Sequence, residues 1–175
     1  MIKKCGKNEV LEPYLEPFNH KKGHLSPLFQ IINYINNTIS AFADIVYGME
    51  LCGTTEYLSG NTITVKGNQT TAIAAKSKSF YATDNTINAL GENLGNSTTT
   101  DSFEPMTAAI HVVGSVANIE YNTINSNSRG IVAEGEFTWI EGNVMNITDN
   151  GLDDSYAVLA EGADVTLYNN TITYV

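Results

Sequence analysis

One spacing recurs along the sequence and constrains its fold more than any other feature. In the stretch AIHVVGSVANIEYNTIN (109–125), Ile110 is followed by apolar residues at plus two, plus seven and plus nine, by a glycine at plus four, and by Asn122 at plus twelve. The same frame starts at Met49, Ile73, Ile131 and Val158, and an asparagine follows twelve residues later each time. Five copies with a constant interval predict a repeat protein.

The pattern inside each copy predicts β-strands. Apolar residues two apart, in short runs broken by Gly and Asn, are typical of strands with one buried face. Repeats of about 20 to 30 residues cannot bury that face alone, so they must stack into a solenoid. Three strands fit each repeat, at positions zero to three, six to ten and thirteen to sixteen. We expect Gly or Ser at plus four in the first turn, and Asn at plus twelve in the second, because Asn tolerates the left-handed backbone of a tight corner.

Stacked repeats would bring equivalent asparagines together at the strand spacing of about 4.8 Å. Each side-chain amide could then donate to one neighbour and accept from the other, which forms a ladder. The simpler interpretation, that these are turn asparagines, is compatible with the ladder. The predicted members are Asn61, Asn85, Asn122, Asn143 and Asn170.

The tripeptide Asn-Thr-Ile, which begins at Asn37, Asn61, Asn85, Asn122 and Asn170, extends the pattern. Through these repeats the chain resembles right-handed parallel β-helix proteins, a group that includes pectate lyases, nitrous-oxidase accessory β-helices and adhesin-like surface proteins. We therefore expect an all-β, right-handed parallel β-helix (solenoid) of five to six rungs of three short strands, with a weaker sixth rung beginning at Leu25. The resemblance implies no single function, because this fold carries lyases, hydrolases, epimerases and non-catalytic stalks.

The two ends of the sequence differ from its middle. Residues 1–24 show no period and predict an irregular N-terminal segment or loose cap, so the β-helix domain is expected to span 25–175. The sequence stops at Val175, at the end of a third strand, where an uncovered solenoid would expose apolar side chains. We expect either further domains beyond Val175, with the chain truncated there, or end-to-end self-association.

Composition limits the partners. The net charge is −10, and residues 23–175 alone carry −12, which disfavours nucleic acid. No apolar run reaches the roughly 18 residues of a membrane span, so no membrane insertion is expected. The resemblance implies a secreted or cell-surface location, although no signal peptide is visible in this chain. With only Cys5 and Cys52, we expect free thiols.

Acidic residues form one group of candidates. Glu134 and Glu161 both fall at plus three on successive rungs, and their rung spacing approximates the roughly 5 Å of a retaining glycosidase pair. Asp153, Asp154 and Glu161 form a candidate Ca²⁺ site, since carboxylates suit this hard cation. The alternative is a solvated acidic face whose carboxylates have raised pKa values.

Aromatic residues form the other group. Tyr57, Tyr81 and Trp139 fall at plus eight, an outward position, where exposed rings could stack on sugars. The alternative is a ladder of rings that cover each other and strengthen the sheet. His111, at plus one, is expected to be a plain surface histidine.

These features favour a non-catalytic cell-surface or secreted β-helix module, adhesin-like or a stalk, that binds a polysaccharide or another glycan. A purely structural repeat without a ligand is a second possibility. The alternative is a carbohydrate-active enzyme, a polysaccharide lyase or glycoside hydrolase, or a fragment of one.

Overall fold

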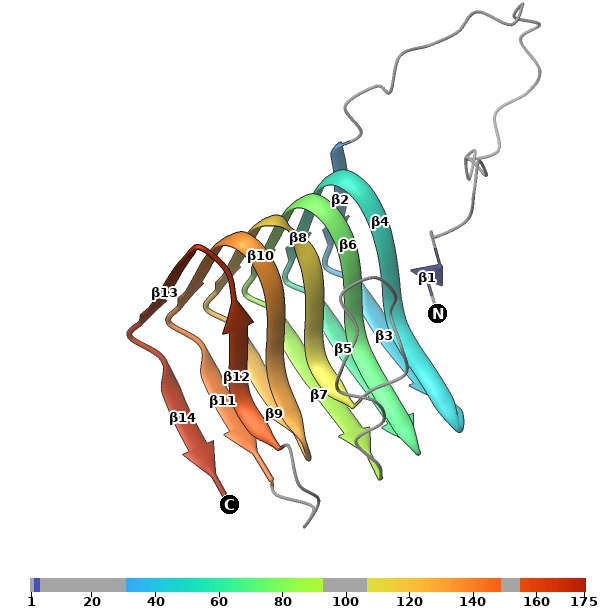
Figure 1. The fold of residues 1–175 in the computed structure, drawn as a ribbon. Coiled ribbons are helices and arrows are strands. Elements are labelled where there is room, and N and C mark those ends of the chain that lie inside the picture. Colours follow the sequence, from blue (N-terminus) through green and yellow to red (C-terminus); the bar gives the residue numbers. More distant parts are fainter. Residues whose placement is uncertain (1, 4–30, 93–106, 149–154) are drawn as a thin grey trace, which may run out of the picture.

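The computed structural model describes residues 2–3, 31–92, 107–148 and 155–175. They form an all-β parallel solenoid of about five turns, in agreement with the predicted right-handed parallel β-helix (Figure 1). No helix occurs among the described residues.

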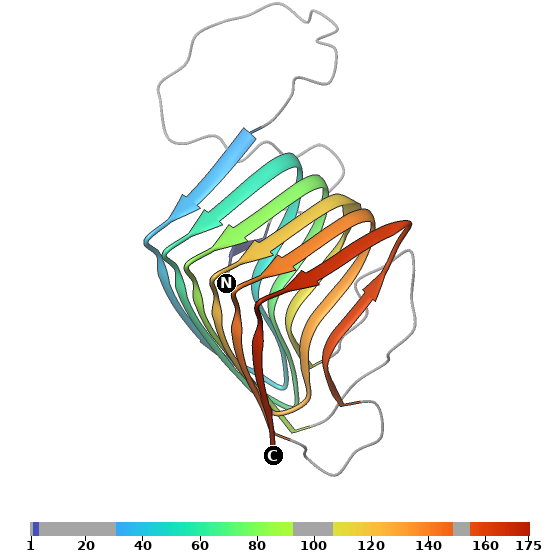
Figure 2. The same ribbon diagram turned by 90° about the vertical axis from the view of Figure 1, so that its left-hand side faces the viewer.

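The strands form two sheets, and Figure 2 shows the stacked turns nearly end-on, with the last turn in front. Sheet A has the order β1-β4-β6-β8-β10-β12, with β2 beside β4 and β13 beside β10. Its strands are β1 (Ile2–Lys3), β2 (Ile31–Ile35), β4 (Ile45–Ser59), β6 (Gln69–Thr83), β8 (Ala108–Glu120), β10 (Arg129–Glu141), β12 (Tyr156–Glu161) and β13 (Asp164–Tyr168). Sheet B has the order β14-β11-β9-β7-β5-β3 and consists of β3 (Thr38–Phe42), β5 (Thr62–Gly67), β7 (Thr86–Gly91), β9 (Thr123–Ser126), β11 (Val144–Ile147) and β14 (Thr171–Tyr174).

The register confirms the repeat frame. Met49, Ile73, Ile110, Ile131 and Val158 are partners on successive parallel strands. The weak first rung is present in its second and third strands, where Tyr34 pairs with Leu58 and Ile39 with Ile63. Residues 25–30, where that rung was expected to begin, lie outside the described residues.

In four turns the predicted first and second strands join into one continuous strand, which bends near plus four. In β8 and β10 this position is a glycine, because the backbone of the preceding turn approaches it closely, whereas β6 has Ser77 there. An added Cβ at Gly135 would lie 2.6 Å from the carbonyl oxygen of Gly114, and one at Gly114 would clash with the carbonyl oxygen of Ser77. Only the last turn divides into separate strands, β12 and β13.

At the second corner of each turn, the residue with left-handed backbone lies one position earlier than expected. The left-handed backbone lies at plus eleven, one position before the ladder asparagine. The residues with positive φ there are Asn36, Gly60, Asp84, Tyr121, Gly142 and Asn169. The asparagine at plus twelve is thereby free to point its amide into the solenoid.

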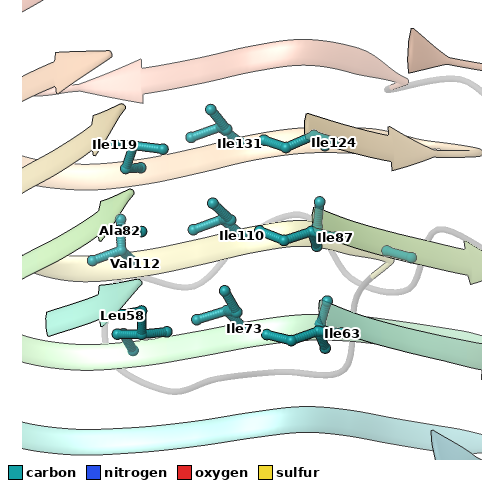
Figure 3. Close-up of a cluster of buried hydrophobic side chains, with 14 of the residues drawn as sticks. Leu58, Ile63, Ile73, Ala82, Ile87, Ile110, Val112, Ile119, Ile124 and Ile131 are labelled. Carbon is teal, nitrogen blue, oxygen red and sulfur yellow. The ribbon is translucent and has the colours of Figure 1, made fainter. Parts of the chain in front are cut away.

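Rows of aliphatic side chains fill the interior (Figure 3). Ile73, Ile110 and Ile131 stack at equivalent positions and are fully buried. Burying each such side chain contributes about 1.5–3 kcal/mol. In the last turn the same rows are open to solvent, since Leu167 and Ile172 are about half exposed, as expected for an uncovered end.

The predicted asparagine ladder is present, and it includes Asn37. In each step the Nδ2 of one asparagine donates to the Oδ1 of the next, at 2.8–3.0 Å, from Asn37 through Asn61, Asn85, Asn122 and Asn143 to Asn170. The same Oδ1 also accepts the backbone N–H of the preceding ladder residue. Buried amides are therefore satisfied by both side chain and backbone.

Candidate functional site

A hollow lies on the outward face of sheet A, across β8, β10 and β13. Two rows of register partners supply its lining, because positions plus six and plus eight point to the same side of a strand. The plus-six row contributes Val116, Phe137 and Asp164, and the plus-eight row contributes Asn118, Trp139 and Thr166. Together with Ala117 and Thr138 they line a volume of about 210 Å³.

Two aromatic rings form much of this lining. Phe137 is 49% exposed and Trp139 is 43% exposed. The indole Nε1–H of Trp139 donates to Glu141 Oε2 at 2.8 Å, and the other oxygen of that carboxylate accepts the Tyr121 hydroxyl at 3.2 Å. The charge of Glu141 and this hydrogen bond raise the pKa of Tyr121, so its hydroxyl stays protonated. The Trp139 ring is thus held in position without losing its exposure.

The polar side chains of the hollow supply several hydrogen-bond acceptors. Asn118 Oδ1 is buried, and no described residue donates a hydrogen bond to it. Asp164 adds an exposed carboxylate and Thr166 a hydroxyl. A buried carbonyl oxygen without a donor costs about 1–3 kcal/mol. The Asn118 side chain as a whole borders the hollow, so a rotation that turned Oδ1 toward a ligand hydroxyl or ammonium would recover part of that cost.

The structure places the three predicted aromatic residues in one row, where Tyr57, Tyr81, Asn118 and Trp139 are successive partners. The rings of Tyr57 and Tyr81 stack on each other, with centroids 4.7 Å apart and planes 14° apart. This pair therefore matches the alternative of rings that cover each other. Asn118 separates it from Trp139, which alone of the three lines the hollow.

The acidic pair at plus three is adjacent, since Glu134 and Glu161 are register partners on β10 and β12. Partial burial, and secondarily the charge of Glu161, raise the pKa of Glu134. Its Oε1 also lies 3.3 Å from His111 Nε2. This arrangement holds a carboxyl group that takes up a proton more readily than an isolated glutamate.

The expectation that His111 is a surface residue is wrong. Its side chain is 1% exposed, and burial together with the nearby charge of Arg129 lowers its pKa to about 4. Arg129 is itself fully buried, with its guanidinium 5.6 Å from the centroid of the Tyr156 ring. These two side chains, at the start of β8 and β10, are therefore covered although strand alternation places His111 on the outward face. Strand alternation alone did not reveal this, because it separates inward from outward positions but not covered from exposed ones.

The predicted calcium site lies mostly outside the described residues. Asp153 and Asp154 lie outside the described residues, and Glu161 is exposed. Within residues 31–92, 107–148 and 155–175, no group of three His, Cys, Asp or Glu side chains is placed to hold a metal ion. The expectation of a free thiol is wrong for Cys52, which is disulfide-bonded; Cys5 lies outside the described residues.

A second row of amides, missed from the sequence, runs along the outward face of sheet B. Asn88 Nδ2 donates to Thr64 Oγ1, Asn125 Nδ2 to Asn88 Oδ1, and Asn146 Nδ2 to Asn125 Oδ1, at 2.8–3.0 Å. The signal was visible at plus fifteen of the frame, where Thr64, Asn88, Asn125 and Asn146 all fall. We name this set the outer amide row.

Among the residues that the structure describes, there is no helix long and apolar enough to cross a membrane. No protein-family model, curated protein or solved structure matches the chain. The geometry of the hollow therefore carries the functional argument.

Proposed function

We propose that this chain is a non-catalytic carbohydrate-binding module of a secreted or cell-surface protein, adhesin-like or stalk-like, and that the hollow beside Trp139 receives a sugar ring. The observation that carries the proposal is an exposed indole, fixed through its Nε1–H, beside a buried carbonyl oxygen that no described residue uses. Aromatic faces stack on the C–H faces of sugars, and a sugar hydroxyl is the donor that Asn118 lacks.

The size of the hollow and the repetition of aromatic residues along the plus-eight row also support a carbohydrate ligand. A volume of about 210 Å³ is below the range of roughly 300–1,000 Å³ typical of drug-sized ligands. It suits one ring of a longer chain. Tyr81 lies two strands from Trp139 in the same row, about 10 Å away at the usual strand spacing. A polysaccharide lying along the solenoid axis would meet both.

The disulfide bond at Cys52 supports the proposed secreted or cell-surface location. Disulfide bonds persist in oxidising compartments and are rare in the cytosol.

Fluorescence tests the proposal directly, because Trp139 is the only tryptophan. Titration with soluble neutral oligosaccharides is expected to quench or shift its emission. Calorimetry on Trp139→Ala is expected to show no binding, while the control Phe42→Ala, which removes an exposed ring from sheet B, keeps the affinity of the parent. Binding that persists in Trp139→Ala would place the site elsewhere.

A retaining glycoside hydrolase is the second candidate, and one observation favours it. Glu134 has a raised pKa, as a general acid requires, and its register partner Glu161 could act as nucleophile. An assay for new reducing ends, with Glu161→Gln as the comparison, separates the two functions. Release of reducing ends that disappears in Glu161→Gln would identify an enzyme.

A further inference from the structure

The charges around the hollow are of one sign. Asp164 lines it, and no Lys, Arg or His is among its lining residues. Glu120 and Glu141 are partners on the same outward face, and Glu141 holds the indole of Trp139. Glu136, next to Phe137, is exposed. A ligand that entered this hollow would meet negative potential and no compensating protein cation.

The hydrogen-bonding groups of the hollow also suit a donor. Asn118 Oδ1, the Asp164 carboxylate and the Thr166 hydroxyl oxygen can each accept a hydrogen bond. A protonated amine offers three donors and no acceptor. Trp139 and Phe137 add ring faces, which attract cations through their quadrupoles, Trp most strongly. A sugar carboxylate would instead face Asp164 and find no basic partner.

We propose that the hollow prefers glycans that carry a free, protonated amino group, that is, cationic amino sugars, over neutral, N-acetylated and acidic ones. The inference rests on the proposed carbohydrate-binding function and specifies its ligand. The sugar ring would stack on Trp139 while its ammonium group approaches Asp164. N-acetylation removes the positive charge and two of the three donors, so the acetylated sugar keeps only the stacking and a single amide donor.

The test compares oligosaccharides of equal length and linkage that differ in one substituent. The parent chain is titrated with β-1,4-linked oligomers of glucosamine, N-acetylglucosamine, glucose and, as an acidic probe, glucuronate, with Trp139 emission as the readout. We expect glucosamine oligomers to bind about three- to tenfold more tightly than glucose oligomers, from one cation–π contact and one ion pair. The preference should shrink as salt screens the charges.

Two variants separate the possible outcomes. Asp164→Asn should bring the affinity for glucosamine oligomers close to that for glucose oligomers, whereas Asp44→Asn removes the same charge from an exposed turn at the other end of the solenoid and should leave the preference intact. Equal binding of amino and neutral oligomers by the parent chain would overturn this inference and leave the proposed function standing. Binding of none of the four would overturn both. An amine preference that survives Asp164→Asn would overturn the assignment to this hollow.

Discussion

Asn118 and Asn122 lie four residues apart in the chain, in two regions with opposite hydrogen-bonding character. At the inner corner, Asn122 Oδ1 accepts from the backbone N–H and the Nδ2 of Asn85, at 3.0 and 2.9 Å. Its Nδ2 lies within hydrogen-bonding distance of the carbonyl oxygens of Ala82 and Glu120 and of Asn143 Oδ1. In the hollow, by contrast, no described residue donates to Asn118 Oδ1.

The comparison shows that residue type does not decide what an asparagine contributes. The corner brings strand ends from two neighbouring turns around each amide, so every donor and acceptor meets a partner and the gain is stability. The hollow lies on the outside of a sheet, where the backbone groups already pair with one another. An amide there is left with an acceptor that no described residue uses, at a cost to the folded chain, and the proposed ligand would supply the missing donor.

The largest effect is expected at the corner. Asn122→Ala leaves the backbone N–H of Asn85 without its acceptor and several other buried groups with fewer partners. Each orphaned group costs about 1–3 kcal/mol, so we expect the free energy of unfolding to fall by about 3 kcal/mol. Urea denaturation followed by circular dichroism measures it. A loss no greater than that of an exposed asparagine would show that the ladder is not stabilising.

In the hollow, we expect a substitution to change the free energy of unfolding less and to lower the affinity for the ligand instead. Asn118→Ala removes a buried oxygen that no described residue uses, which relieves its desolvation cost, but it also removes packing contacts of the side chain. The two effects oppose each other, so the free energy of unfolding should change by no more than about 1 kcal/mol in either direction. The affinity for the preferred oligosaccharide should fall about tenfold, the equivalent of one hydrogen bond of about 1.4 kcal/mol. Denaturation and calorimetry on the same preparation give both values. A large loss of stability with unchanged affinity would reverse the roles assigned to the two asparagines.

The smallest effect is expected on sheet B. Asn125, in the outer amide row, makes side-chain hydrogen bonds to Asn88 and Asn146 but lies near solvent. Water replaces these partners, so Asn125→Ala should change the free energy of unfolding by about 0.5 kcal/mol or less and leave binding unaffected. This variant is the matched control for Asn122→Ala, since both remove an amide from a row of asparagines. A cost equal to that of Asn122→Ala would mean that stacking of amides, rather than burial, is what stabilises.

The ladder was predictable because it follows from spacing alone. Once five asparagines recur at one position of a stacked repeat, they must meet. The position of the left-handed residue could also have been predicted, because the residue before the ladder asparagine is Asn or Gly in four turns, at Asn36, Gly60, Gly142 and Asn169. It was missed because Asp84 and Tyr121 occupy the same position without the usual preference for positive φ.

The hollow and the covered His111 were not predictable in the same way. The hollow depends on side chains of different size at two positions on three neighbouring strands, and on which of them leaves space beside Trp139. No single repeat contains that information. The burial of His111 and Arg129 likewise depends on what covers an outward face, which the period of a strand does not specify.

The hydrogen bonds of the asparagine ladder all run in one direction, from the Nδ2 of each turn to the Oδ1 of the next. The row of amides therefore has a polarity along the solenoid axis. At Asn170 the Nδ2 donates to the carbonyl oxygens of Ile140 and Tyr168. A further amide that continued the row past Asn170 would have to present its oxygen to this nitrogen, as each ladder residue does to the one before it, so the row can be prolonged only with the same polarity.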